Sequence, residues 1–199
     1  MTIARMRIAA RRGRSAAEIL LQLLADEEPA LLDHAREVAA LAAPVSLALG
    51  LPRRDREDVA CAAELHDIGK LAIPVGLLAT PGPLGIPELE VMRRHTVVGE
   101  AMISGAPSLR RAAALVRASH ERWDGRGYPD GLRGEAIPLG ARIVAVCDAF
   151  SAMREDRPYG AVLTDDEAVA ELRRCVGTQF DPRVVHAFCH AHGASAVAV

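Results

Sequence analysis

The sequence predicts an all-α fold, a helical bundle that carries two long loops rich in glycine and proline. Apolar residues recur at helical spacing along most of the 199 residues, and no segment alternates as a strand does. Half of the residues are hydrophobic but only 3% are aromatic, so Ala, Leu, Val and Ile must fill the core. Fifteen of the 28 Gly and Pro residues fall within residues 69–87 and 125–140, where rigid loops are expected. The length suits one domain.

Capping signals and helix breakers define the first three expected helices. A capping box at residues 15–18 opens a helix that extends to about Glu28. The next helix is expected over about residues 31–50, with a bend at Pro44. A third helix is expected over about residues 54–67. These three helices occupy the N-terminal third of the chain.

Proline and capping residues open the remaining helices. We expect these helices to begin at Pro87, Ser108, Pro138, Thr164 and Asp181-Pro182. His95 lies on the first of them, His120 at the end of the second and Asp148 at the end of the third. Three residues of chemical interest are therefore expected on three different helices.

Composition and charge exclude several classes of protein. The net charge is -2 and aromatic residues are scarce, which argues against nucleic-acid binding. No uncharged stretch reaches the roughly 20 apolar residues needed to cross a membrane, and the basic N-terminus is a poor signal sequence. The four cysteines form no CxxC pair, so reduced thiols are expected. We therefore expect a soluble, cytoplasmic protein with no membrane contact.

His66 and Asp67 are adjacent at the end of the third expected helix. Neighbouring helical side chains point about 100° apart, so this pair needs partners from other helices to close a metal site. Four residues could supply them: His34, His95, His120 and Asp148. Imidazole and carboxylate ligands suit Fe, Mn or Zn better than Ca or Mg. A carboxylate such as Asp67 can bridge two metals, and such a pair stabilises both oxygens of a phosphoryl displacement.

Each of these residues also has an ordinary structural explanation. A single histidine on a helix is usually a cap or a surface residue, and Asp148 follows an apolar run that it could simply end. Four of the seven histidines beside two carboxylates on successive helices are harder to explain in this way. His186, His190 and His192 also have helical spacing, but we expect them on a solvated last helix.

Two motifs, His66-Asp67-Ile68-Gly69-Lys70 and Gly127-Tyr128-Pro129, resemble those of the HD-GYP domain, a branch of the HD phosphohydrolase superfamily. Lys70 is the only lysine among 24 basic residues. The resemblance continues in order through further segments and covers about residues 31–190. These segments include residues 92–95, 120–129, 148–150 and 177–182. It predicts an HD-domain helical bundle in three parts: a basic arm and helix at 1–29, the HD-GYP domain at 30–192 and a tail at 193–199.

The resemblance implies hydrolysis of cyclic di-GMP by a hydroxide that bridges two divalent metal ions, with Fe or Mn expected and Zn, Ni or Mg as alternatives. The positions that match metal ligands are His34, His66, Asp67, His95, His120 and Asp148. Asp67 would be the bridge, and Lys70 would polarise the phosphate or the leaving oxygen. Arg157 matches a phosphate-binding arginine.

The Gly127-Tyr128-Pro129 loop is expected to shape the substrate pocket. It is also expected to contact partner domains of the diguanylate cyclase type or other signalling domains. Trp123 and Tyr128 are candidates for stacking on guanine, with core packing as the alternative for Trp123. The chain is expected to be a monomer or a homodimer.

The sequence departs from the family pattern at four positions. Ser119 stands where a second histidine usually precedes the Glu-Arg-Trp-Asp run, and Ser151 stands where an aspartate is usual. Gly160 and Ala30 replace a basic residue and a glutamate. We therefore expect at most two metals, the second bound weakly, and the linear dinucleotide pGpG as the main product. The alternatives are a lapsed domain that binds nucleotide or a partner, and a hydrolase of another nucleotide.

Overall fold

The computed structural model of the chain describes residues 15–78, 80, 82–155 and 162–193. In these residues the secondary structure is helical throughout, apart from one isolated bridge between Val176 and Phe180. The all-α prediction is therefore confirmed. The elements are α2 (Ala16–Glu27), α3 (Pro29–Ala48), α4 (Arg53–Leu65), η1 (Ile68–Ala72), α5 (Val75–Leu78), α6 (Ile86–Arg93), α7 (His95–Ser104), η2 (Pro107–Leu109), α8 (Arg110–Arg117), η3 (Gly134–Ala136), α9 (Leu139–Arg154), α10 (Asp165–Arg174) and α11 (Pro182–Ala191).

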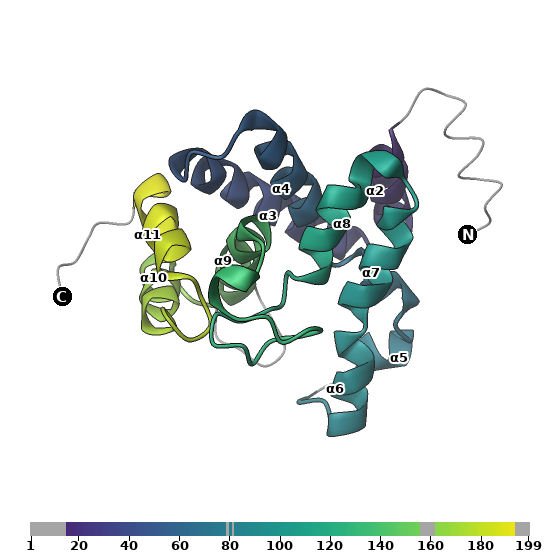
Figure 1. Cartoon of the computed structure of the whole chain (residues 1–199). Helices are drawn as coiled ribbons and strands as arrows, with labels where there is room; N and C mark the ends of the chain where they lie inside the picture. The colour runs from purple at the N-terminus through teal and green to yellow at the C-terminus, as the bar shows by residue number, and fades with distance from the viewer. Residues whose placement is uncertain (1–14, 79, 81, 156–161, 194–199) are drawn as a thin grey trace.

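The helices α3, α4 and α9 pack against one another and form the centre of the domain. Figure 1 shows α10 and α11 on one side of α9, and α7 and α8 on the other. The shared core consists mainly of Ala, Val, Leu and Ile, because the chain has few aromatic residues to fill it. Helix α2 also packs on this core through Leu20, while its Leu24 packs in a smaller cluster with Leu32 and Ala35 of α3. In the part of the chain that the structure describes, no helix is long and apolar enough to span a membrane.

The expected capping signals at three helix starts are confirmed. Ser15 and Glu18 form a capping box at α2, and Thr164 forms another at α10 with Glu167. Asp181 caps α11 by accepting a hydrogen bond from the backbone N–H of Arg183. These residues satisfy N–H groups that the first turn of a helix would otherwise leave unpaired.

Several details differ from the sequence-based prediction. The helix expected to carry His95 ends at Arg93, and His95 begins a new helix, α7. Ser108 does not cap α8, because it lies inside the short 3-10 helix η2. The first glycine- and proline-rich stretch is only partly irregular, since it contains η1 and α5.

Helix α9 also continues to Arg154, so Asp148 lies within it and does not end it. His120 follows the end of α8 in a turn. Both differences affect the site, because they place Asp148 on a rigid helix and His120 at the start of the second long loop.

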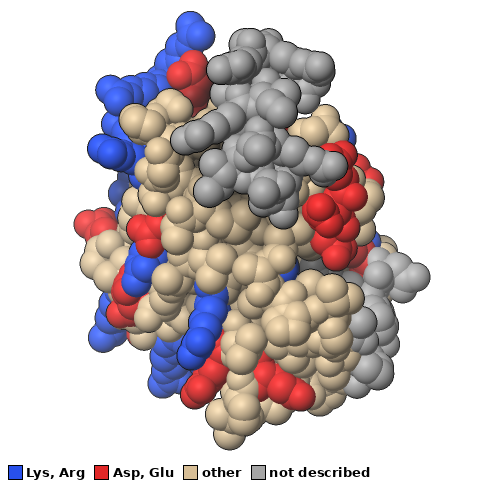
Figure 2. Space-filling view, turned by 90° about the vertical axis from the view of Figure 1, so that its right-hand side faces the viewer, with Lys and Arg blue, Asp and Glu red and all other residues tan. Residues whose placement is uncertain are grey.

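Both signs of charge occur on the face of the molecule shown in Figure 2. Lys and Arg side chains gather along one edge of this view, and Asp and Glu side chains form a cluster near the opposite edge. This distribution agrees with the small net charge of -2.

Candidate metal centre

The junction between α4 and η1 places His66 and Asp67 in the interior. His66 is the C-cap of α4, Asp67 is the N-cap of η1, and both are almost fully buried. The Nδ1 atom of His66 lies 2.7 Å from the carbonyl oxygen of Ala63, which can only accept a hydrogen bond. Nδ1 therefore carries the proton, and the Nε2 atom is left to face the site.

His95 reaches the same place from the first turn of α7. Its Nδ1 atom donates to the carbonyl oxygen of Met92 over 2.7 Å, so its Nε2 atom is also left for the site. This Nε2 atom lies 3.4 Å from Oδ1 of Asp67. The other carboxylate oxygen of Asp67 lies 3.5 Å from Nε2 of His66 and 2.5 Å from Nζ of Lys70. Asp67 thus lies between the two histidines.

His34 on α3 and Asp148 on α9 complete the side of the site nearest His66. The Nε2 atom of His34 lies 3.0 Å from Oδ1 of Asp148, and the same oxygen lies 3.7 Å from Nε2 of His66. The packing of α3, α4 and α9 in the centre of the domain therefore brings these three side chains together.

His120 closes the other side of the site from the turn after α8. Its ring centroid lies 4.9 Å from that of His95, and it stacks on the ring of Tyr128 with centroids 5.2 Å apart. The backbone N–H of Tyr128 donates to the carbonyl oxygen of His120 over 3.2 Å. The buried carboxylate of Glu121 accepts hydrogen bonds from the N–H groups of Asp130 and Leu132, which holds the loop against the site.

Five of the six side chains form two overlapping groups that fit metal ions, and Asp148 lies beside His66 of the first group. His34, His66 and Asp67 offer ligand atoms within 4.8 Å of one another, and Asp67, His95 and His120 do the same. The buried Nε2 atoms of His66, His95 and His120 have no hydrogen-bond partner, and neither has Oδ1 of Asp67. Buried polar atoms are rarely left in this state. Divalent ions of the Fe, Mn or Zn kind would satisfy these nitrogen and oxygen atoms, and Asp67 is shared by both groups.

The electrostatics of the site follow from its burial and its opposite charges. Burial lowers the pKa of His120 to about 4. Burial also acts to lower the pKa of His66, but the Asp67 and Asp148 carboxylates outweigh this effect and raise it to about 9. Burial acts to raise the pKa of Asp67, yet Lys70, His66 and His95 hold this pKa well below its usual range. Asp67 is therefore ionised at neutral pH and available as a ligand.

The other predicted site residues lie around this cluster. The Gly127-Tyr128-Pro129 segment lies beside His120, and a Cβ atom on Gly127 would meet the backbone of Arg122 at 2.3 Å. Only glycine therefore fits there without a shift of the loop. Arg157 lies outside the described residues, as does Gly160.

The two candidates for stacking on guanine, Tyr128 and Trp123, each have an arginine over the ring. The guanidinium carbon of Arg93 lies 5.3 Å from the centroid of the Tyr128 ring, and that of Arg142 lies 5.7 Å from the Trp123 ring. Trp123 contacts none of the six clustered side chains through a hydrogen bond or ring contact that the structure records. Stacking of Trp123 or Tyr128 on guanine stays a prediction.

The departures from the family pattern have definite positions. Ser119 is buried, and its hydroxyl donates to the carbonyl oxygen of Val116 over 2.9 Å. Ser151 is also buried, and its hydroxyl oxygen lies 3.2 Å from Nδ1 of His34.

The sequence analysis assigned no role to two nearby carboxylates, Glu121 and Glu155. The helix predicted from sequence ended at Asp148, whereas Glu155 is the C-cap of α9 seven residues further on, so no local pattern pointed to it.

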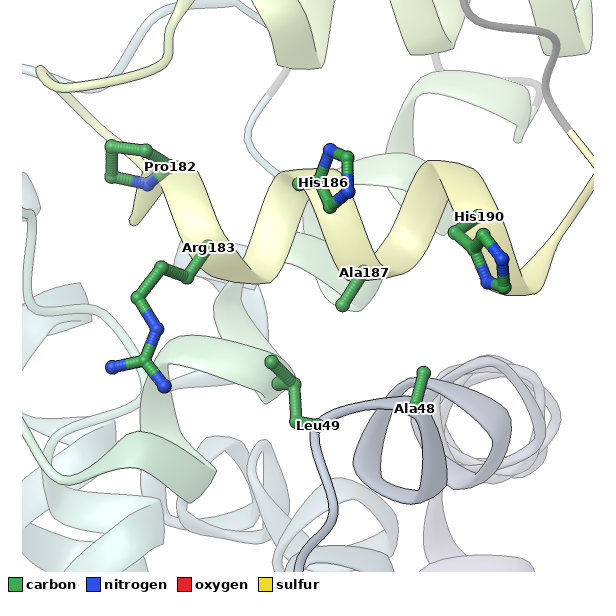
Figure 3. Close-up of a pocket in the computed structure, with 7 residues that line it drawn as sticks. All are labelled: Ala48, Leu49, Pro182, Arg183, His186, Ala187 and His190. Carbon is green, nitrogen blue, oxygen red and sulfur yellow. The ribbon is translucent and has the colours of Figure 1, made fainter.

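A separate groove of about 640 Å³ lies between the end of α3 and α11 (Figure 3). It is lined by Ala48, Leu49, Pro182, Arg183, His186, Ala187 and His190, and it contains none of the six clustered residues. His186 and His190 are exposed on α11, and His192 is exposed just after it. The expectation of a solvated last helix is confirmed for His186 and His190, whereas His192 follows the helix and contacts the carbonyl oxygen of Leu41.

The fold and the site together define an all-α domain with a buried histidine–aspartate centre suited to divalent metals. The HD domain family model matches residues 18–184 of the chain. Because this match covers most of its length, the chain belongs to the HD domain family.

Two relatives and two solved structures support this assignment. The chain is 46% identical over 160 residues to the cyclic di-GMP phosphodiesterase response regulator RpfG of Xanthomonas campestris pv. campestris, covering 79% of this chain and 42% of that protein. It is 39% identical over 157 residues to a cyclic di-GMP phosphodiesterase of Thermotoga maritima, covering 78% and 43%. The chain thus spans less than half the length of these relatives.

The solved structures show the same fold at low sequence identity. An HDG"Y"P protein from Bdellovibrio bacteriovorus matches with a TM-score of 0.66 and 19% identity, over 82% of this chain and 52% of that chain. A cyclic GMP-AMP specific phosphodiesterase of Vibrio cholerae matches with a TM-score of 0.67 and 18% identity, over 89% and 48%. The resemblance to HD-GYP proteins that the sequence motifs indicated is confirmed.

Proposed function

We propose that this chain is a cytoplasmic phosphodiesterase that hydrolyses cyclic di-GMP to the linear dinucleotide pGpG with two divalent metal ions. One observation carries the proposal: two groups of buried ligand atoms share Asp67, so two metals would lie side by side. His34, His66 and Asp148 would hold one metal, and His95 and His120 the other. Fe or Mn is the expected metal, with Zn, Ni or Mg as alternatives.

The metal pair, when bound, supplies Lewis-acid stabilisation for the attacking and leaving oxygens of a phosphoryl displacement. The chain itself contributes orientation and charge. Backbone carbonyls fix the rings of His66 and His95, so their Nε2 atoms need no rearrangement to bind metal. The ammonium group of Lys70 lies at the edge of the site, with its side chain one quarter exposed, and offsets negative charge that the phosphate gains in the transition state.

The substrate assignment rests on the relatives. The two relatives described above, at 46% and 39% identity, are cyclic di-GMP phosphodiesterases. A Vibrio cholerae relative at 33% identity is a 3'3'-cGAMP-specific phosphodiesterase. The higher identities favour two guanine bases over one guanine and one adenine.

The second long loop would contact the nucleotide. Gly127, Tyr128 and Pro129 would shape the wall of the pocket beside His120, and Arg157 would bind a phosphate. The same Gly-Tyr-Pro segment would dock signalling domains such as diguanylate cyclases. The oligomeric state would be a monomer or a homodimer.

Anaerobic incubation with Mn²⁺ or Fe²⁺ and cyclic di-GMP, with chromatographic separation of the products, tests the proposal. We expect pGpG from the parent protein and none from a His66→Ala, Asp67→Ala double variant. His186→Ala is the matched control, because it removes an exposed histidine outside the site and should retain full activity. Parallel reactions with 3'3'-cGAMP and cyclic di-AMP measure substrate preference.

Each outcome has a definite meaning. Faster turnover of 3'3'-cGAMP than of cyclic di-GMP would replace the proposed substrate and keep the phosphodiesterase. No turnover of any cyclic dinucleotide with either metal would contradict the proposal and favour a lapsed domain that binds nucleotide or a partner.

A further inference from the structure

Helix α9 and the residue that follows it contact both nitrogen atoms of the His34 ring. Asp148 and Ser151 lie three residues apart on one face of α9, and Glu155 is the C-cap residue directly after the helix. Asp148 lies 3.0 Å from Nε2 of His34, while Ser151 and Glu155 lie 3.2 and 2.5 Å from Nδ1. Two carboxylates therefore flank one imidazole ring, one at each nitrogen.

A neutral imidazole has only one proton to offer to these two carboxylates. If Asp148 were the hydrogen-bond acceptor, the ring proton would be on Nε2, the atom that faces the proposed metal site. If Glu155 is the hydrogen-bond acceptor, the ring proton is on Nδ1 and the lone pair of Nε2 is free. A metal can bind only the second form, because a protonated nitrogen has no lone pair to donate.

The surroundings of Glu155 favour the second form. The hydroxyl of Ser151 has one proton, and it lies 3.0 Å from Oε2 of Glu37, which can only accept it. Arg154 lies 3.0 Å from the other oxygen of Glu37, which fixes that carboxylate as the partner of Ser151. The shortest contact that Nδ1 of His34 makes is then the one to Glu155.

We propose that Glu155 is a positioning residue for the metal centre: its carboxylate holds the proton of His34 on Nδ1 and leaves Nε2 free to bind metal. This inference rests on the proposed function, because that function makes the cluster a metal site. What it concerns, however, is metal affinity and the tautomer of His34 rather than hydrolysis. A carboxylate that accepts the second N–H of a ligating histidine also makes the ligand more basic, and its loss usually costs 10–100-fold in metal affinity.

The test compares Glu155→Ala with the parent in two measurements. A titration with Mn²⁺, followed by the EPR signal of the free ion, should show affinity reduced about 10–100-fold. Burial acts to lower the pKa of His34, but the Asp148 and Glu155 carboxylates outweigh it and raise this pKa, so the spectra are recorded at a pH where the ring is neutral. Nitrogen-15 NMR of the metal-free protein should then show the His34 proton on Nδ1 in the parent and on Nε2 in the variant. Glu155→Gln keeps the size of the side chain and should lower the affinity in the same direction, which covers the case in which the alanine variant does not fold.

Two further variants separate positioning from general charge. Glu37→Ala removes a carboxylate of the same cluster that does not contact His34. The Ser151 hydroxyl can then donate to Oε1 of Glu155, 3.3 Å away, so the Mn²⁺ affinity and the tautomer should stay unchanged. Ser151→Asp combined with Glu155→Ala returns a carboxylate to a position whose hydroxyl already lies 3.2 Å from Nδ1, so it should restore both properties.

The results that would overturn the inference are distinct from failure of the proposed function. Unchanged affinity and an unchanged Nδ1 proton in the Glu155 variants would refute it even if the parent hydrolyses cyclic di-GMP. An equal loss in Glu37→Ala would also refute it, because the effect would then be one of general charge. A parent protein that binds Mn²⁺ but hydrolyses no dinucleotide would contradict only the proposed function.

Discussion

Gly69 lies directly against the backbone of His95. A Cβ atom added to Gly69 would lie 1.9 Å from the carbonyl oxygen of His95 and 2.7 Å from the backbone nitrogen of Gly99. No side chain fits at this contact, so η1 and α7 approach each other backbone to backbone. This approach lets Oδ1 of Asp67 come within 3.4 Å of Nε2 of His95, although the two residues belong to different elements.

Gly69→Ala is therefore expected to damage both stability and metal binding. The atoms it would meet belong to the backbone and cannot rotate away, so η1 must shift from α7. We expect the free energy of unfolding to fall by about 3 kcal/mol, together with weaker Mn²⁺ binding, as measured by denaturant unfolding and metal titration. Gly105→Ala is the control, because nothing lies within 4 Å of its Cβ position. Equal stability of the two variants would contradict this account of the contact.

Lys70 is expected to matter for turnover rather than for metal content. Its ammonium group lies 2.5 Å from Asp67, and a protonated amine has no lone pair to offer a metal. Lys70→Met should lower kcat for cyclic di-GMP by about 100- to 1,000-fold, the usual effect of losing one group that stabilises transition-state charge. Lys70→Arg should not restore the rate, because a planar guanidinium does not replace a compact ammonium.

Metal analysis of the same samples distinguishes this role from a ligand role. The Lys70→Met protein should bind as many Mn²⁺ ions as the parent. Arg54→Met, which removes an exposed cation on α4, should change neither quantity. Loss of bound metal from the Lys70 variant would show that the residue acts on the centre itself.

The metal-free protein is expected to be most stable near pH 6.5. The pKa of His120 falls to about 4 in the folded state, below its ordinary value of about 6.5. The unfolded chain therefore binds more protons between these values, and stability is lost as the pH falls from about 6.5 towards 4. The pKa of His66 rises to about 9, so its contribution is present below about pH 6.5 and is lost as the pH rises towards 9.

Thermal unfolding of chelator-treated protein from pH 4 to 9 measures both effects. His120→Gln should flatten the acid side of the profile, and His66→Gln should flatten the alkaline side. His186→Gln changes an exposed histidine on α11 and should reproduce the parent profile. A parent Tm that rises steadily from pH 6.5 to 9 would contradict the assignment for His66.

Sequence patterns were sufficient for the helices with strong local signals. The capping boxes at Ser15 and Thr164 predicted the starts of α2 and α10 because their hydrogen bonds are formed within four residues. The break between Arg93 and His95 was missed, because local apolar spacing continues across it. The close packing of α7 on η1 at Gly69 and Gly99 is a tertiary contact, which local spacing does not indicate.

The six clustered residues were identified from sequence motifs, whereas their supporting contacts were not. His34 and Glu155 are 121 residues apart, and no periodic pattern relates them. Glu121 belongs to the Glu-Arg-Trp-Asp run of the family pattern, but its hydrogen bonds from the N–H groups of Asp130 and Leu132 depend on the path of the loop. Side chains that hold a ligand in place are set by tertiary packing, so the sequence alone does not indicate them.

Ser119 is expected to leave the second metal weakly bound and not to act as a ligand itself. Its hydroxyl is already used by the carbonyl oxygen of Val116, and the residue is only 2% exposed. Ser119→Ala should therefore leave Mn²⁺ binding and the pGpG product unchanged and cost about 1 kcal/mol of stability for the lost hydrogen bond. Ser119→His adds an imidazole next to His120 and should tighten binding of the more weakly held metal.

Titration with Mn²⁺ and elemental analysis of both variants measure these effects. The parent should hold no more than two ions, because a third would need donor atoms beyond the two groups that share Asp67. Three tightly bound ions per chain would show that residues outside these groups bind metal. Weaker metal binding by Ser119→Ala would mean that the hydroxyl leaves Val116 and turns to the metal when the centre is loaded.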